Sequence, residues 1–262
     1  MSVLVQNVNL HLVDQGSGIP TLFLHGNPDS ADMWQGVIKN LSKQYRCLAP
    51  DLPGFGRTKA PADFDYSLTN MASFIAGLVD FLHLDEPLNL VTHDLGTSFG
   101  LAWAVKNPGR VRRIAVSNAI FFSDYRWHFW GRVWRTPLLG EMSMLLMNWM
   151  IFRIEMQRSS RRLTLAHQRS TYAMMSAPTR RMILRLYRAS TPANFAGWED
   201  DLLTLTSRIP TCILWGDHDP YLPSKYAERY GAQQVHHFPD CGHWLPAEAA
   251  EEASNRLTRF FA

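Results

Sequence analysis

The chain has 262 residues, of which 46% are hydrophobic, 19% charged and 12% aromatic. This composition is typical of a folded globular protein and excludes disordered, collagen-like and disulfide-stapled chains. The formal net charge is +3, which is too close to neutral for the positive surface that a nucleic-acid-binding protein presents.

Short apolar runs alternate with helical patterns along most of the chain. The first eighteen residues contain an alternating strand pattern, V-N-L-H-L-V, that runs into a glycine-containing turn. Further strands are predicted at Thr21–Leu24, Cys47–Ala49, Leu88–Thr92, Arg113–Ser117, Thr211–Trp215 and Gln234–Phe238. Apolar residues at i, i+3 and i+4 predict helices at Asn70–Leu82, Ser98–Asn107 and Ala247–Phe261. Strands that alternate with helices predict an α/β fold whose mostly parallel sheet carries helices on both faces.

The alternation stops after Ser117 and resumes at Ile209. Residues 121–190 hold twelve arginines, no lysine and three acids, a local balance of +9, so the rest of the chain carries −6. Because the sheet pattern continues afterwards, we interpret this stretch as a helical cap inserted after the sixth strand. Residues 1–119 and 207–262 are then the core domain, and residues 120–206 the cap. We expect the arginines of the cap to face solvent or the acidic core, and the charge of the cap either to dock it electrostatically or to attract anions such as a released halide.

The strongest local signal is L-N-L-V-T-H-D-L-G-T-S-F-G, from Leu88 to Gly100. A strand enters a tight turn with Asp94 at its apex and Gly96 two residues later, and a helix leaves the turn. This pattern indicates a nucleophile elbow, a strained strand-to-helix turn that pushes one side chain clear of the sheet. A carboxylate at the apex forms a stable ester when it attacks a saturated carbon, and water can later cleave that ester. Taken alone, Asp94 could equally be a helix N-cap.

Three further segments favour the catalytic interpretation. F-L-H-G-N-P (Phe23–Pro28) follows a strand and brings backbone N–H groups near Asn27, which could form an oxyanion hole with the N–H of Leu95. I-L-W-G-D-H-D-P, residues 213–220, ends another strand with carboxylates at its carboxyl edge. His243 lies in a loop after the last strand. The resulting order of nucleophile, acid and histidine is that of α/β-hydrolases.

Across essentially its whole length the sequence resembles the α/β-hydrolase superfamily, and specifically its Asp-nucleophile branch of haloalkane dehalogenases and epoxide hydrolases. The matching motifs are H-G-N-P (His25–Pro28), D-L-P-G-F-G-R-T (Asp51–Thr58), H-D-L-G (His93–Gly96), W-G-D-H-D-P-Y-L-P (Trp215–Pro223) and C-G-H-W (Cys241–Trp244). The resemblance assigns the catalytic acid to Asp219 rather than Asp217. The other acid position that such enzymes use falls near Asn118, which is not an acid.

The resemblance implies a two-step reaction. Asp94 displaces a leaving group from an sp³ carbon and becomes an ester, and His243, oriented by Asp219, activates the water that hydrolyses it. The N–H groups of Asn27 and Leu95 stabilise the oxyanion. No cofactor and no metal is required by this chemistry.

Two kinds of leaving group are open. Dehalogenases hold the departing halide with weak donors, and Asn27 matches the asparagine that the family uses. Leu95 stands where a tryptophan is usual, so a cap tryptophan, Trp127 or Trp149, is expected to substitute for it.

Epoxide hydrolases instead need two cap tyrosines to protonate the ring oxygen. Tyr125, Tyr172 and Tyr187 are the candidates. We rank cleavage of a carbon–halogen bond first, because Asn27 matches the family and the catalytic acid is at the later position, Asp219. Epoxide hydrolysis to a diol ranks second. A non-catalytic binding or sensor protein on a hydrolase fold is the third hypothesis.

Cysteine usage and the N-terminus indicate the compartment. The three cysteines, Cys47, Cys212 and Cys241, are widely spaced and predict reduced thiols in the cytoplasm. We expect no signal peptide and no membrane insertion, because the longest apolar stretch, Leu138–Phe152, is too short to span a bilayer. The expected partners are a small apolar organic substrate, water and a halide ion, without nucleic acid, in a monomer or homodimer.

Overall fold

Eight strands form one sheet in the computed structural model, which describes residues 1–262, in the order β1-β2-β4-β3-β5-β6-β7-β8. The strands are β1 (Ser2–Val5), β2 (Val8–Gln15), β3 (Pro20–Leu24), β4 (Arg46–Pro50), β5 (Leu88–His93), β6 (Val111–Ser117), β7 (Thr211–Gly216) and β8 (Gln234–Phe238). The β1–β2 and β2–β4 pairs are antiparallel, and all other neighbouring strands are parallel. The predicted α/β fold with a mostly parallel sheet is confirmed.

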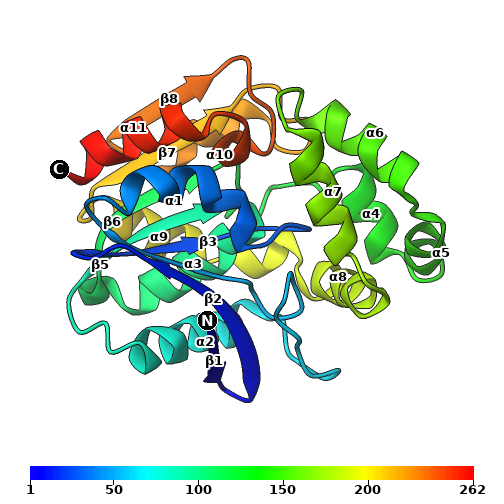
Figure 1. The fold of residues 1–262 in the computed structure, drawn as a ribbon, viewed down its shortest axis with the longest axis horizontal. Helices are drawn as coiled ribbons and strands as arrows, with labels where there is room; N and C mark the ends of the chain where they lie inside the picture. The colour runs from blue at the N-terminus through cyan, green and yellow to red at the C-terminus, as the bar shows by residue number, and fades with distance from the viewer.

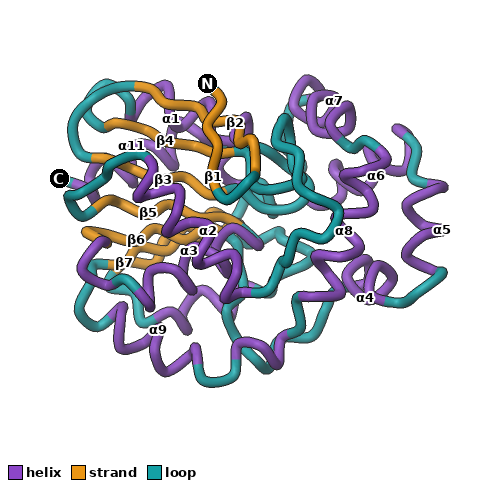
Figure 2. Tube along the Cα trace, turned by 90° about the horizontal axis from the view of Figure 1, so that it is seen from below, coloured by secondary structure: helices purple, strands orange, loops and turns teal.

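Helices cover both faces of the sheet, as Figures 1 and 2 show. One face carries α1 (Gln35–Leu41) and α11 (Ala250–Phe261), and the other carries α2 (Leu68–Phe81), α3 (Leu95–Lys106) and α9 (Trp198–Thr206). All six residues of the central strand β5 are buried, whereas the edge strand β1 alternates exposed and buried residues. A strand covered on both faces needs apolar residues throughout, which explains the continuous apolar runs in the sequence.

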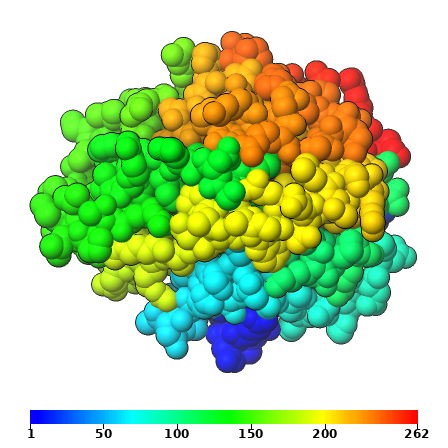
Figure 3. All heavy atoms as spheres, turned by 180° about the vertical axis from the view of Figure 1, so that it is seen from behind, coloured from blue at the N-terminus to red at the C-terminus, as the bar shows by residue number.

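Six α-helices lie between β6 and β7, and the first five of them gather beyond one end of the sheet (Figures 1 and 2). They are α4 (Phe129–Arg135), α5 (Leu139–Leu146), α6 (Trp149–Ser159), α7 (Leu165–Met174) and α8 (Ala177–Ala189), and we refer to them together as the cap. The division of the chain into core and cap at residues 120 and 206 stays a prediction. Within the predicted insert, α9 packs against α3 on the sheet. Figure 3 shows the segment leading to α9, in yellow, extending from the cap along the core.

The arginines of the cap do not hold it to the core through ion pairs. Arg180 donates to the backbone oxygens of Met144, Met147 and Met175. Arg135 donates in the same way to backbone oxygens within or next to α8. The arginines of the cap that form ion pairs, Arg158 and Arg188, pair with glutamates of the cap itself, so electrostatic docking through the overall charge of the cap stays a prediction. The orphan carbonyls at the ends of these short helices are the better partners, because they are the groups left unsatisfied by the helix itself.

The predicted elements match the structure except at their ends. The strand β1 was not predicted as separate from β2. The predicted helix 247–261 is interrupted at Ala249, whose backbone (φ −131°, ψ 47°) is not helical, and becomes α10 (Leu245–Glu248) and α11. Helix α3 begins at Leu95, three residues earlier than predicted. The three cysteines are free thiols and buried, and no helix of the structure is long and apolar enough to cross a membrane.

Candidate active site

Asp94 stands between the end of β5 and the first residue of α3. Its φ of 47° and ψ of −129° place it in a backbone region that L-residues rarely adopt. Two glycines make the turn possible. A Cβ on Gly96 would lie 2.3 Å from the backbone oxygen of His25, and a Cβ on Gly26 would lie 2.4 Å from the Cβ of Asp94. The turn is therefore as tight as the sequence motif predicts.

The carboxylate of Asp94 faces backbone N–H groups. Asn27 donates its backbone N–H to Oδ2 at 2.8 Å, and the N–H of Leu95 lies close enough to this carboxylate to lower its pKa. Burial raises the pKa of Asp94, and the two N–H groups and nearby His243 offset only part of that rise. No side chain donates to Asp94, so its charge is held by backbone dipoles and remains available to a ligand.

His243 and Asp219 form a buried pair. The Nδ1 of His243 lies 2.7 Å from Oδ2 of Asp219, and the two side chains are 4% and 0% exposed. Burial lowers the pKa of His243, but the Asp219 carboxylate outweighs burial and raises the pKa above 6.5. Asp217, which the sequence motif also offers, pairs instead with His237 at the surface. The structure thus brings Asp219, and not Asp217, to the imidazole.

Asn118 holds Asp219 in place. Its Nδ2 donates to Oδ2 of Asp219 at 2.9 Å and to the backbone oxygen of Gly216 at 3.0 Å, and its Oδ1 accepts the N–H of Gly216 at 2.8 Å. The other oxygen of Asp219 accepts the backbone N–H groups of Tyr221 and Leu222. Because every lone pair direction of this carboxylate is filled by fixed donors, the histidine is held in one orientation.

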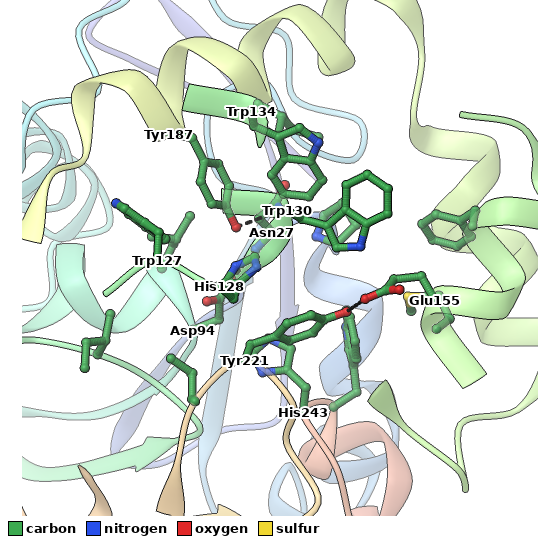
Figure 4. Close-up of a pocket in the computed structure, with 18 of the residues that line it drawn as sticks. Asn27, Asp94, Trp127, His128, Trp130, Trp134, Glu155, Tyr187, Tyr221 and His243 are labelled. Carbon is green, nitrogen blue, oxygen red and sulfur yellow. Dashed lines mark hydrogen bonds between the residues drawn. The ribbon is translucent and has the colours of Figure 1, made fainter. Parts of the chain in front are cut away.

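A pocket, partly open to solvent, lies above these residues, and 15 of its 21 lining residues are hydrophobic. Asn27, Asp94, Leu95 and His243 all line it, together with cap residues (Figure 4). Apolar walls with a few polar groups are typical of a site for a small organic molecule. The structure contains no group of three His, Cys, Asp or Glu side chains with a geometry that holds a metal.

The cap residues named from the sequence divide into two sets. Tyr125, Trp127 and Tyr187 line the pocket. Trp149 and Tyr172 lie outside it and pack against each other with their ring centroids 5.6 Å apart. The indole N–H of Trp127 is buried without a partner and has no accessible surface. Neither tryptophan suggested as a halide donor therefore offers its N–H to the cavity.

Three other groups supply donors to the pocket. Asn27 Nδ2 donates one hydrogen to the hydroxyl of Tyr187 at 3.3 Å, while the hydroxyl proton of Tyr187 has no acceptor. His128 accepts the N–H of Gly131 at Nδ1, at 3.2 Å, so its proton sits on Nε2, which has no partner. Burial lowers the pKa of His128 to about 4, with the charge of His243 adding to the effect. His128 is thus a neutral N–H donor near neutral pH, with its ring between those of Tyr187 and Tyr221.

Sequence reasoning missed several lining residues: His128, Trp130, Trp134, Glu155 and Tyr221. No local motif marks His128 or Glu155, because they belong to different cap elements and meet only when the cap folds over β5. Tyr221 lies inside the motif of Asp219, and its place two residues after the acid was the one available signal.

Comparisons with known proteins agree with this architecture. A family model described as alpha/beta hydrolase fold matches residues 20–141. The 2-hydroxy-6-oxo-2,4-heptadienoate hydrolase of Pseudomonas putida is 30% identical, over 94% of this chain and 90% of the relative. The cis-3-alkyl-4-alkyloxetan-2-one decarboxylase of Shewanella oneidensis is 27% identical, over 96% of this chain and 84% of the relative. A haloalkane dehalogenase of Agrobacterium fabrum is 42% identical over 108 residues, 41% of this chain and 35% of the relative.

Solved structures show the same fold. The crystal structure of DBJA superposes with a TM-score of 0.84 and 21% identity, over 99% of this chain and 95% of that one. The epoxide hydrolase CorEH without ligand gives a TM-score of 0.84 and 20% identity, over 100% of this chain and 97% of that one. The chain belongs to the α/β-hydrolase family and is a hydrolase enzyme. Within that family, haloalkane dehalogenases are among its relatives.

Proposed function

We propose that the protein is a hydrolase in which Asp94 forms a covalent ester with the substrate. The observation that carries the proposal is a carboxylate, not a hydroxyl or thiol, at the apex of the elbow. It faces the pocket, with the His243–Asp219 pair beside it. Attack on a carbonyl carbon would give a reactive anhydride, whereas attack on a saturated carbon gives an ester that water can hydrolyse.

The geometry supports both steps. In the first step an oxygen of Asp94 forms a bond to carbon, and the leaving group departs with the bonding electrons. In the second step Nε2 of His243 takes a proton from water, whose oxygen attacks the ester carbonyl. The bond between that carbonyl carbon and the alkyl oxygen then breaks, His243 returns the proton to the departing alcohol, and Asp94 is left as a free carboxyl group. The N–H groups of Asn27 and Leu95, which already contact the carboxylate, stabilise the oxyanion. Asp219 keeps the proton of neutral His243 on Nδ1 and leaves Nε2 free to act as base.

A halide is the leaving group that the donors of the pocket favour. Asn27 and His128 present neutral N–H groups, which solvate an anion but are poor acids, and a departing halide needs only solvation. Tyr187 adds a hydroxyl whose proton is uncommitted. The sequence similarity to a haloalkane dehalogenase points the same way.

Epoxide hydrolysis is the second candidate, and Tyr187 is the residue that favours it. Ring opening requires a proton on the leaving oxygen, and a buried tyrosine hydroxyl next to Asn27 is placed to give one. The other pocket tyrosines are committed, because Tyr125 donates to the backbone oxygen of Tyr221 and Tyr221 donates to Glu155. Because the pocket offers one free phenol and epoxide hydrolases use two, we rank this reaction below dehalogenation.

The test combines products with trapping of the intermediate. Wild-type protein is incubated with 1-bromobutane and with styrene oxide while bromide and diol are measured. A cis-3-alkyl-4-alkyloxetan-2-one is the third substrate, because the Shewanella relative is named for its decarboxylation. Bromide alone supports the first candidate and diol alone the second. Turnover of none of them indicates a substrate outside these three, or the third hypothesis from the sequence, a non-catalytic binding or sensor protein.

His243→Gln separates the two chemical steps, because it removes the base but keeps Asp94. We expect mass spectrometry of this variant to show one substrate group attached to the peptide that contains Asp94. Asp94→Asn is the matched control and should carry no adduct. The contrary result is an unmodified Asp94 in His243→Gln after incubation with a substrate that wild type turns over. That result rejects the Asp-nucleophile mechanism.

A further inference from the structure

The pocket contains a second carboxylate that the proposed reaction does not use. Glu155 lies on α6 and lines the cavity with Phe152 and Met156 from the same helix. Its Oε1 accepts the hydroxyl of Tyr221 at 2.8 Å, and its side chain is 18% exposed. Figure 4 shows Glu155 and Asp94 on opposite sides of the pocket. A carboxylate has about four acceptor positions, so Glu155 keeps capacity for a ligand.

Aromatic rings line the same cavity. Trp130, Trp134, Phe152, Tyr221 and Trp244 all contribute to it. The indole N–H groups of the three tryptophans are buried without accessible surface, so these residues meet the cavity with ring carbon and not with a hydrogen-bond donor. Aromatic faces attract cations through their quadrupole.

No lysine or arginine lines the pocket. The nearest cation to Glu155 is Arg158, one turn further along α6, whose guanidinium lies 3.7 Å from Oε2 and is 63% exposed. An exposed pair of this kind contributes little, because water screens it. The negative charge of Glu155 is therefore not neutralised on the side that faces the cavity.

We propose that Glu155 and the aromatic rings around the cavity form a binding site for an alkylammonium group. The substrate of the proposed reaction then carries a reactive carbon at one end and an ammonium group at the other. Its apolar chain lies along the hydrophobic walls, with the cation at Glu155 and the reactive carbon at Asp94. Substrates that end in a carboxylate are rejected, because Asp94 and Glu155 are both negative. This inference names the substrate class of the proposed reaction and in that sense rests on it.

Binding of unreactive ligands tests the inference without requiring turnover. n-Hexylammonium, hexan-1-ol and hexanoate have the same chain and differ in the charge of their end group. Isothermal titration calorimetry measures the affinity of each for wild type, Glu155→Gln, Asp94→Asn and Glu141→Gln. Glutamine can still accept the hydroxyl of Tyr221. Glu141 is a matched control, because it is a cap glutamate paired with Arg188 outside the pocket.

In wild type we expect n-hexylammonium to bind at least about tenfold more tightly than hexan-1-ol, and hexanoate to bind most weakly. Glu155→Gln should reduce the affinity for n-hexylammonium about tenfold, which is about 1.4 kcal/mol, and leave hexan-1-ol unchanged. Glu141→Gln should behave as wild type. Equal affinities of wild type for n-hexylammonium and hexan-1-ol overturn the inference. So does a loss of affinity in Asp94→Asn that Glu155→Gln does not share, because the cation then sits at the other carboxylate.

Arg158→Gln provides a second variant that does not depend on the folding of Glu155→Gln. Because water screens this exposed guanidinium, its removal should leave the affinity for n-hexylammonium unchanged or slightly higher, and weaker binding contradicts the inference. The proposed function fails on a different readout, namely the absence of bromide, diol and a covalent adduct on Asp94. The two failures are therefore distinguishable.

Discussion

The Nε2 atom of His167, on cap helix α7, lies 2.6 Å from Oδ2 of Asp29, two residues after Asn27 in the core. The Asp29 side chain is 2% exposed and that of His167 14% exposed. Burial lowers the pKa of His167, but Asp29 outweighs burial and raises it above 6.5. Burial also raises the pKa of Asp29, but His167 outweighs it and lowers the pKa below 3.8. The pair therefore ties the cap to the loop that carries the backbone N–H of Asn27.

The stability that this pair contributes depends on pH. A raised histidine pKa stabilises the fold fully below pH 6.5 and less as the pH rises through the folded-state pKa, whereas the lowered pKa of Asp29 contributes above pH 3.8. His167→Gln should lower the free energy of unfolding by about 3 kcal/mol near pH 5.5, because it leaves a buried carboxylate without its cation, and by less near pH 9. Urea unfolding of both proteins at the two pH values measures this difference. The exposed His218→Gln is the control, and an equal loss at both pH values contradicts the prediction.

Turnover should depend on the protonation of His243. Its raised pKa means that the imidazole becomes a free base only above pH 6.5, so kcat should rise through an inflection above that value. Asp219→Asn removes the charge that raises the pKa and favours the wrong tautomer. We expect kcat to fall about 10⁴-fold and the inflection to move to lower pH. An inflection that stays in place would show that another group titrates.

The donors of the pocket can be separated by substrate. His128→Phe and Tyr187→Phe should each lower the rate of bromide release from 1-bromobutane about tenfold or more, because each removes one hydrogen bond to the leaving group. With styrene oxide, Tyr187→Phe should be far more damaging than His128→Phe, because only the phenol gives up a proton. Tyr125→Phe is the control, since its hydroxyl is engaged with the backbone oxygen of Tyr221. Equal effects of His128→Phe and Tyr125→Phe on bromide release contradict the role of His128.

The elbow should not tolerate a methyl group at Gly96. A Cβ there would meet the backbone oxygens of His25 and Leu24 at 2.3 and 2.6 Å, and backbone cannot move aside as a side chain can. Gly96→Ala should lower the free energy of unfolding by about 3 kcal/mol, although alanine is the better helix former. Gly109→Ala is the matched control, because a Cβ at Gly109 meets nothing within 4 Å. Thermal or urea unfolding compares the two variants.

The core of this fold was predictable because each strand and each helix is one continuous stretch of sequence. The spacing of apolar residues also differs between strands and helices, so the two can be told apart. The elbow at Asp94 and the order of Asp94, Asp219 and His243 are likewise local motifs, and the structure brings these residues together. The helices of the cap were harder to predict, because they are short. Their boundaries are set by single capping residues such as Asn148, Thr164 and Ser176.

The cap residues of the pocket could be predicted least well. Residue type alone makes Trp149 and Tyr172 candidates, whereas in the structure they pack against each other inside the cap. His128 was overlooked, although its capping contact with Gly131 fixes the position of its proton. Which face of a short helix meets the cavity depends on how the cap sits on the core, and residue type carries no information about that.

The hydrogen bond between Asn118 and Asp219 has a consequence for how such sites diversify. The ends of the neighbouring strands β6 and β7 lie so close that Nδ2 of Asn118 and Nδ1 of His243 share one oxygen atom of Asp219. A carboxylate that arose at position 118 would thus stand next to the same imidazole. Two substitutions, one gaining an acid after β6 and one losing it after β7, would therefore move the acid from one strand to the next without displacing the histidine, and both arrangements would serve the same reaction.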